Sequence, residues 1–136
     1  MSDATTVLLI DNDPQYRVYY AQRLYASRSK YDVVEAATGQ SGLDICARQP
    51  IDCVVLEIDL PDMSGFEVLA KLVPRAYHPE IAVIILTRLS NPFLLDAATK
   101  NGAQAALQKT VGSGDLLVQS ILNAISAVKL LNRLVG

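Results

Sequence analysis

Cysteine and histidine are scarce in this 136-residue sequence, and long apolar runs are missing from it. The two cysteines, Cys46 and Cys53, lie within apolar patterns, so we interpret them as core residues of a reduced, cytoplasmic protein and not as a disulfide or metal pair. The one histidine, His78, lies in a loop between prolines and is expected at the surface. No apolar run reaches the roughly 18 residues of a membrane span, and residues 1–6 lack the basic start of a signal peptide, so we expect neither.

An excess of positive charge is also missing. The 12 Lys and Arg residues are outnumbered by 14 Asp and Glu residues, for a net charge of −2. This balance argues against a nucleic-acid-binding face. What the chain does have is apolar content, at 51% of its residues, which in a chain of single-domain length is enough to bury a substantial core.

Short apolar runs alternate along the chain with segments of helical pattern and turn residues. The expected strands are residues 5–10, 32–36, 53–56, 81–86 and 105–108. The expected helices are residues 14–27, 41–49, 64–73, 92–101 and 112–134. A strand followed by a helix, five times over, predicts an α/β fold with a doubly wound, five-stranded parallel sheet and helices on both faces.

Polar residues follow four of these strands, at the sheet edge where ligands bind in such folds. They are Asp11 and Asn12, Glu57, Thr87 and Lys109. Carboxylates that lie close together need a cation or a shared proton, and oxygen ligands suit Mg²⁺. Each residue also fits an ordinary role when taken alone: a helix cap for Asp11, a strand-end hydroxyl for Thr87, and a solvated charge for Lys109 or Arg88.

Five motifs, in this order and spacing, resemble the receiver domain of two-component response regulators over about residues 5–128. They are LLIDNDP at 8–14, VVLEIDLPDMSG at 54–65, VIILT at 83–87, NGA at 101–103 and QK at 108–109. The resemblance implies a flavodoxin-like fold with strand order 2-1-3-4-5. It also implies a signalling domain, not an enzyme, that accepts a phosphoryl group from a histidine kinase or phosphotransfer protein with Mg²⁺.

The resemblance assigns a role to each polar residue at the predicted edge. Glu57 takes the phosphoacceptor position, Asp11 and Asn12 the acidic pocket, Thr87 the switch hydroxyl and Lys109 the phosphate-binding lysine. The implied ligands of a weakly bound Mg²⁺ are the side chains of Asp11 and Glu57 and the main-chain carbonyl of Asp59.

The chain departs from the family pattern at five positions. They are Glu57 for the acceptor aspartate, Asn12 for a second acid, Arg88 for a small residue, Ala106 for a switch aromatic and Thr110 for a cis-proline. A cis bond before a non-proline residue costs about 2.5–4 kcal/mol, so the Lys109–Thr110 bond is expected to be trans. Arg88 or Lys109 is expected to pair with Glu57 and close the edge without phosphate, and a solvent-facing Arg88 is the alternative.

Three functions fit this sequence. The first, which we expect, is a receiver with impaired or phosphorylation-independent switching. The second is a receiver that still takes phosphate on Glu57 or a neighbouring acid. The third is a small phosphoryl-transfer or hydrolytic enzyme, which the chain supports poorly because it has neither a glycine-rich phosphate loop nor a histidine near the predicted edge.

The apolar pattern of the last helix runs on through Leu131, Leu134 and Val135, past the expected end of the domain. We therefore expect a receiver domain at residues 1–128 and, at 129–136, the start of a linker helix to an output or kinase module beyond Gly136. This stripe is expected to pair with a second copy as a short coiled coil. The alternative is a helix end that frays in the isolated domain.

Overall fold

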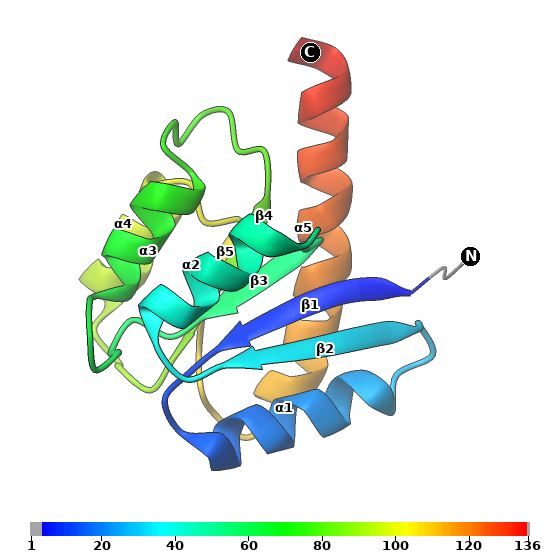
Figure 1. Cartoon of the computed structure of the whole chain (residues 1–136), viewed down its shortest axis with the longest axis vertical. Helices are drawn as coiled ribbons and strands as arrows, with labels where there is room; N and C mark the ends of the chain where they lie inside the picture. Colours follow the sequence, from blue (N-terminus) through cyan, green and yellow to red (C-terminus); the bar gives the residue numbers. More distant parts are fainter. Residues whose placement is uncertain (1–3, 136) are drawn as a thin grey trace.

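The computed structural model describes residues 4–135, which form a parallel sheet covered by helices on both faces (Figure 1). The strand order is β2-β1-β3-β4-β5, so the predicted fold class and strand order are confirmed. In chain order the elements are β1 (Thr5–Ile10), α1 (Pro14–Tyr25), β2 (Tyr31–Ala36), α2 (Gly39–Arg48), β3 (Cys53–Leu56), α3 (Gly65–Leu72), β4 (Ala82–Thr87), α4 (Pro92–Lys100), β5 (Ala105–Gln108) and α5 (Ser113–Val135).

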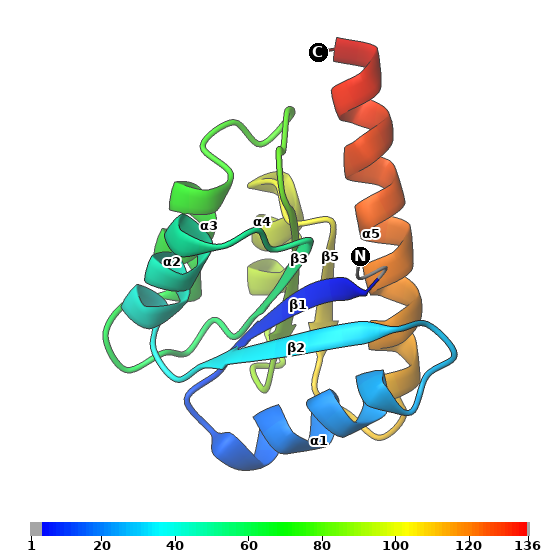
Figure 2. The same ribbon diagram turned by 45° about the vertical axis from the view of Figure 1, so that its right-hand side comes forward.

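Side chains that alternate along the central strands build two separate cores. In β1, Val7 and Leu9 pack in the cluster that α1 and α5 cover, whereas Leu8 and Ile10 pack in the cluster that α2, α3 and α4 cover. Figure 2 shows the same division of the helices between the two faces of the sheet. Because both faces are covered, the central strands are apolar over most of their length, as in residues 7–10 of β1 and throughout β3.

The parallel register brings the predicted polar residues to one edge of the sheet. Ile10 at the end of β1 lies opposite Leu56 at the end of β3, so the next residues, Asp11 and Glu57, leave the sheet side by side. Lys109 follows β5 directly and enters the same edge from the other side of β4.

The start of α2 differs from the prediction, which placed it at residue 41. The helix begins at Gly39, because Thr38 caps it and forms a capping box with Ser41. Asp62 accepts the first backbone N–H of the helix, that of Gly39, at 2.9 Å. A Cβ on Gly39 would lie 2.6 Å from the Met63 side chain, so close packing and not a turn calls for glycine here.

The other boundaries lie near their predicted places. Asp13 caps α1, with Pro14 at its first position, and Gly102 ends α4 with a φ of +106°. Thr87 is the last residue of β4 and not the first residue beyond it. The Lys109–Thr110 bond is trans as predicted, since residues 4–135 contain no cis peptide bond.

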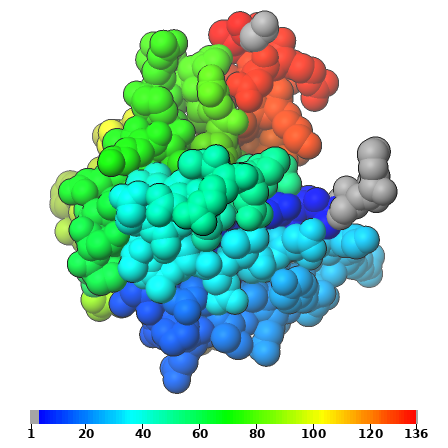
Figure 3. All heavy atoms as spheres, in the orientation of Figure 1, coloured from blue at the N-terminus to red at the C-terminus, as the bar shows by residue number. Residues whose placement is uncertain are grey.

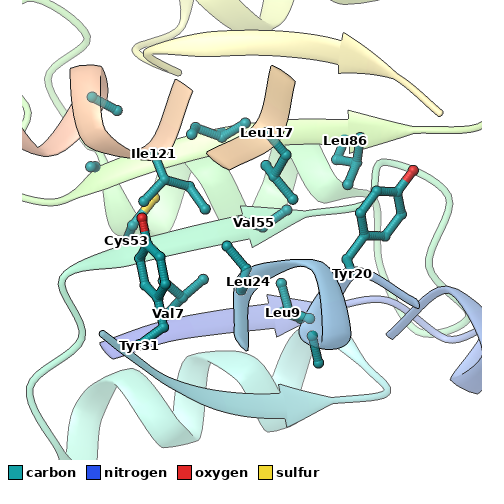
Figure 4. Close-up of a cluster of buried hydrophobic side chains, with 14 of the residues drawn as sticks. Val7, Leu9, Tyr20, Leu24, Tyr31, Cys53, Val55, Leu86, Leu117 and Ile121 are labelled. Carbon is teal, nitrogen blue, oxygen red and sulfur yellow. The ribbon is translucent and has the colours of Figure 1, made fainter. Parts of the chain in front are cut away.

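Helix α5 is continuous over 23 residues and has two parts. Its first part packs on the sheet through Leu117, Ile121, Ala124 and Val128, and Figure 4 shows Leu117 and Ile121 beside β3 and β4. Its last turns project beyond the sheet in Figures 1 and 2 and lie at the edge of the molecule in Figure 3. By length and hydropathy alone α5 would qualify as a membrane span, but its buried first part belongs to the core of this sheet.

Helix α5 continues without a break into residues 129–135, the segment that was predicted to begin a linker helix. Leu130, Leu134 and Val135 are 52%, 75% and 61% exposed, whereas Leu131 is half-buried. The exposed stripe is therefore Leu130, Leu134 and Val135, which we call the α5 end stripe. Gly136, beyond which an output module was expected, lies outside the described residues.

Candidate functional site

Lys109 lies at the centre of the predicted edge and bridges two carboxylates. Its Nζ lies 2.5 Å from Oδ2 of Asp11 and 2.9 Å from Oε1 of Glu57. The side chains of Lys109 and Glu57 are each only 2% exposed, and that of Asp11 is 11% exposed. Three predicted site residues from β1, β3 and β5 are thus held together by a buried ion pair, which we call the Lys109 bridge.

The Glu57 carboxylate is also saturated by backbone amides. Its Oε2 accepts the N–H groups of Ile58 and Asp59 at 2.7 and 3.3 Å. Its Oε1 accepts the N–H of Arg88 at 3.2 Å, in addition to Lys109. The extra methylene of glutamate lets the side chain fold back onto the backbone that follows it, so neither oxygen is left for solvent.

The protonation state of this pair follows from these contacts. Burial by itself raises the pKa of the Glu57 carboxyl, but the Thr87 hydroxyl, Lys109 and the Arg88 amide outweigh burial and place that pKa below its ordinary value. Burial lowers the pKa of the Lys109 ammonium, and Asp11 and Glu57 outweigh it and raise that pKa. Both groups are therefore charged at neutral pH.

Aromatic and polar neighbours complete the surroundings of the bridge. The ring of Tyr16, in the first turn of α1, lies under the ammonium, with Nζ of Lys109 3.8 Å from the ring centroid. Arg17 donates from Nη1 to the backbone carbonyl of Asp11 at 2.6 Å and pairs with Glu35 through Nε at 2.9 Å. Thr87 is fully buried, and its hydroxyl accepts the N–H of Leu89 at 3.2 Å.

Tyr16 and Arg17 were not among the site residues that the sequence predicted. Their position in the first turn of α1 could have indicated that they lie near the site. Pro14 fixes the start of α1, so residues in its first turn stand next to the carboxyl end of β1, where a ring or guanidinium can reach the edge of the sheet.

Of the two cations predicted to pair with Glu57, Lys109 does so and the Arg88 side chain does not. Successive side chains of a strand point to opposite faces, so a buried Thr87 directs the next residue outward. The Arg88 guanidinium pairs instead with the Asp59 carboxylate, both about half exposed. Lys109, the other cation named in the prediction, is the one that pairs with Glu57.

The two carboxylates predicted to bind magnesium are both paired with Lys109. The side chain of Asp59, whose main-chain carbonyl is the third expected ligand, pairs with Arg88. Among residues 4–135 there is no group of three or more His, Cys, Asp or Glu side chains placed to hold a metal ion. Asn12, the neutral replacement for a second acid, lies exposed beside the pocket. In this arrangement the carboxylates are occupied by an ammonium group, so Mg²⁺ would have to compete with Lys109 for Asp11 and Glu57.

Comparison with known proteins gives a consistent result. The sequence profile of the response regulator receiver domain matches residues 7–121. The chain is 35% identical over 115 residues to the transcriptional regulatory protein KdpE of Mycobacterium tuberculosis, covering 85% of this chain and 49% of that protein. It is 29% identical over 115 residues to the nitrate/nitrite response regulator protein NarL of Escherichia coli, covering 85% and 52%.

Solved structures agree with the fold. A response regulator receiver domain protein from Clostridium thermocellum superposes with a TM-score of 0.78 at 30% identity, covering 93% of this chain and 98% of that one. The chain thus matches a receiver domain over nearly its whole length, and it spans only about half the length of the two curated relatives.

Proposed function

This chain belongs to the response regulator receiver domain family, and we propose that it is a receiver whose switching is impaired or independent of phosphorylation. The observation that carries this proposal is the Lys109 bridge, in which the residue at the acceptor position is a buried glutamate already paired with a buried lysine. The chain's own side chains then occupy the pocket in place of a phosphoryl group and a metal ion.

Glu57 is poorly placed to accept phosphate. An acceptor oxygen must be reached in line by the phosphoryl donor, but both oxygens of Glu57 accept hydrogen bonds and the residue is 2% exposed. To free Oε1, its contact with the Lys109 ammonium must break, and to free Oε2, two hydrogen bonds from backbone amides must break. The added methylene also moves the carboxylate, and a misplacement of ~1 Å can slow a reaction about 10²-fold.

The charge of the site supports the same state. Glu57 carries one negative charge where a phosphoryl group would carry about −1.5 to −2. It nevertheless pairs directly with Lys109, the residue that the family resemblance assigns to phosphate binding. We infer that Glu57 partly imitates a phosphorylated acceptor.

A second function remains supported by one observation. Asp59 lies at the same edge with its carboxylate half exposed, so a receiver that still takes phosphate on an acid next to Glu57 is the alternative. In that case Arg88 would have to release Asp59 for transfer to occur.

Exposure to acetyl phosphate and Mg²⁺ tests the proposal. We expect the wild-type domain to show no mass gain by intact-mass spectrometry under conditions that phosphorylate ordinary receivers, because transfer to Glu57 is slowed about 10²-fold or more. Stoichiometric phosphorylation that Glu57→Gln abolishes would overturn the proposal. Phosphate mapped to Asp59 and lost in Asp59→Asn would support the second function.

We also propose how the domain treats its metal ion and its partners. Mg²⁺ should bind weakly, since two of its expected ligands neutralise Lys109. A histidine kinase or phosphotransfer protein and an output or kinase module after residue 136 are the expected partners, as the relatives are named as transcriptional and response regulators. We also propose that this domain itself works in the cytoplasm, catalyses no reaction and contacts neither nucleic acid nor membrane.

The α5 end stripe suits a second copy of this chain. Leu130 and Leu134 lie one helical turn apart on a helix that has no sheet beneath it at this point, and Val135 adjoins them. Pairing of two such helices would bury these side chains, which otherwise remain an exposed apolar patch.

Light scattering tests this pairing. We expect the wild type to gain mass toward a dimer at high concentration and Leu130→Asp with Leu134→Asp to remain monomeric. Leu116→Asp, at an equally exposed leucine in the first turn of the same helix, is the control and should still pair. A wild type that stays monomeric at every concentration would end the idea.

A further inference from the structure

Lys109 has a third partner besides its two carboxylates. The Tyr16 ring lies against its ammonium, with Nζ 3.8 Å from the centroid. The carboxylates approach from the ends of β1 and β3, whereas the ring belongs to α1, which covers the sheet. Any shift of the ammonium out of the pocket therefore also breaks a cation–π contact with this helix.

The contact continues along α1 to a second tyrosine. Tyr20 lies one turn after Tyr16, and the two rings are stacked with centroids 6.3 Å apart and planes 20° from parallel. Tyr19 packs edge-on against Tyr20 at 5.0 Å. Tyr20 is only 4% exposed, and its ring is packed in the core cluster that α1 and α5 cover.

The hydroxyl of Tyr20 then reaches the first residue of α5. Its oxygen lies 2.7 Å from Oγ of Ser113, and both residues are buried. Burial raises the pKa of the Tyr20 hydroxyl, so it stays protonated at neutral pH and can serve this hydrogen bond. Figure 4 shows Tyr20 at the end of the core cluster nearest the carboxyl ends of the strands, with Tyr31 at the opposite end.

A short loop also connects Lys109 directly to the start of α5. Only residues 110–112 separate Lys109 from Ser113, and Gly112 turns with a φ of +88°. Arg23 of α1 pairs with Asp115 of α5 as a second tie between the helices. The start of α5 is thus joined to Lys109 both through this short loop and through two tyrosines.

We propose that Tyr16 and Tyr20 are positioning residues, which hold Lys109 in the bridge and transmit its position to the first turn of α5. In β5 the position of the family's switch aromatic is Ala106. An aromatic link between the site and α5 therefore has to come from α1. The inference rests on the proposed function in treating the position of Lys109 as the state of the domain. A cleft of about 640 Å³, lined in part by Tyr16, Tyr20 and Lys109, borders this buried relay.

Amine acylation followed by peptide mass spectrometry tests the first half of the relay. Lys109 should be labelled slowly in the wild type and about fivefold or more faster in Tyr16→Leu, which keeps the apolar bulk but removes the ring face. Tyr16→Phe keeps the face and should label like the wild type. Lys100, which is exposed, is the internal reference for the reagent.

Amide hydrogen exchange of residues 113–118 tests the second half. We expect Tyr20→Phe, Ser113→Ala and Tyr16→Leu each to speed exchange there, with α3 on the other face of the sheet unchanged. Tyr16→Leu added to Tyr20→Phe should give little further change, because both break one path.

Equal labelling of Lys109 in all Tyr16 variants, or additive exchange in the double variant, would overturn the inference. Neither measurement uses phosphate, so they can fail while the acetyl phosphate result stands, and the reverse also holds.

Discussion

A Lys109→Met variant is expected to lose about 3–5 kcal/mol of unfolding free energy at neutral pH, because it leaves two carboxylates buried without their cation. Asp11 and Glu57 share this one ammonium, whose side chain is 2% exposed. Methionine has a similar length and fills the space, so the loss reflects charge and not a cavity. Urea unfolding with an unchanged m-value is the measurement.

The pH dependence of that variant should have the opposite sign to that of the wild type. In the wild type the folded pKa of Glu57 is lowered, so its stabilisation is present above the unfolded pKa and is lost as the pH falls through the folded value. The raised pKa of Lys109 gives stabilisation below its unfolded pKa that is lost as the pH rises through the folded one. Without Lys109, Glu57 is a buried carboxylate that faces Asp11 with no cation between them, which favours its protonated form, so lowering the pH from neutral should stabilise the variant.

Lys100→Met is the matched control for charge removal. Lys100 pairs with Asp96 at 2.9 Å, but both side chains are more than half exposed, so its loss should cost under about 0.5 kcal/mol. Glu57→Gln together with Lys109→Met should be less destabilised than the sum of the single variants. Equal small losses for Lys109→Met and Lys100→Met would show that the bridge adds no stability.

The convergence of Asp11, Glu57 and Lys109 could be predicted from the sequence because it follows from topology. Each residue directly follows a strand of one parallel sheet, and the carboxyl ends of such strands meet at one edge. The order of strands and the alternation of helices then decide which residues are neighbours. No side-chain geometry is needed for that step.

The details of the site could not be predicted, because they depend on rotamers and on tertiary contacts. Whether Arg88 turns toward Glu57 or Asp59 is decided by the direction of Thr87 in β4. The backbone amides that saturate Glu57 belong to Ile58, Asp59 and Arg88, and nothing in the sequence pattern indicates that these N–H groups point at the carboxylate. The place of Tyr16 under Lys109 depends on how α1 packs against the sheet.

The boundary of α2 depends on a local signal that the sequence analysis did not use. Glycine is a poor helix residue, and the helix was predicted to begin only at residue 41, but Thr38 caps it and forms a capping box with Ser41. The contact with Met63 explains why position 39 is a glycine, and that contact could not be predicted from the sequence.

The last prediction concerns what would restore phosphorylation. Asn12→Asp combined with Glu57→Asp is expected to be phosphorylated by acetyl phosphate about 10²-fold faster than the wild type. The shorter aspartate draws the carboxylate back from the amides of Ile58 and Asp59. The Asn12→Asp substitution adds a carboxylate at an exposed position beside Asp11, which provides the oxygen ligands that Mg²⁺ requires.

The two substitutions act on different defects, so neither alone should give the full gain. Glu57→Asp repairs the acceptor but leaves a pocket with too little negative charge to hold both Mg²⁺ and Lys109. Asn12→Asp repairs the charge but leaves Glu57 bound to Lys109 and three amides. Asn12→Asp with Glu57→Asn is the control and should gain no phosphate, and the gain in the double aspartate variant should disappear when Mg²⁺ is chelated. If that variant is no faster than the wild type, the restraint lies in the contacts that hold Lys109, with Tyr16 foremost, and not in the missing acids.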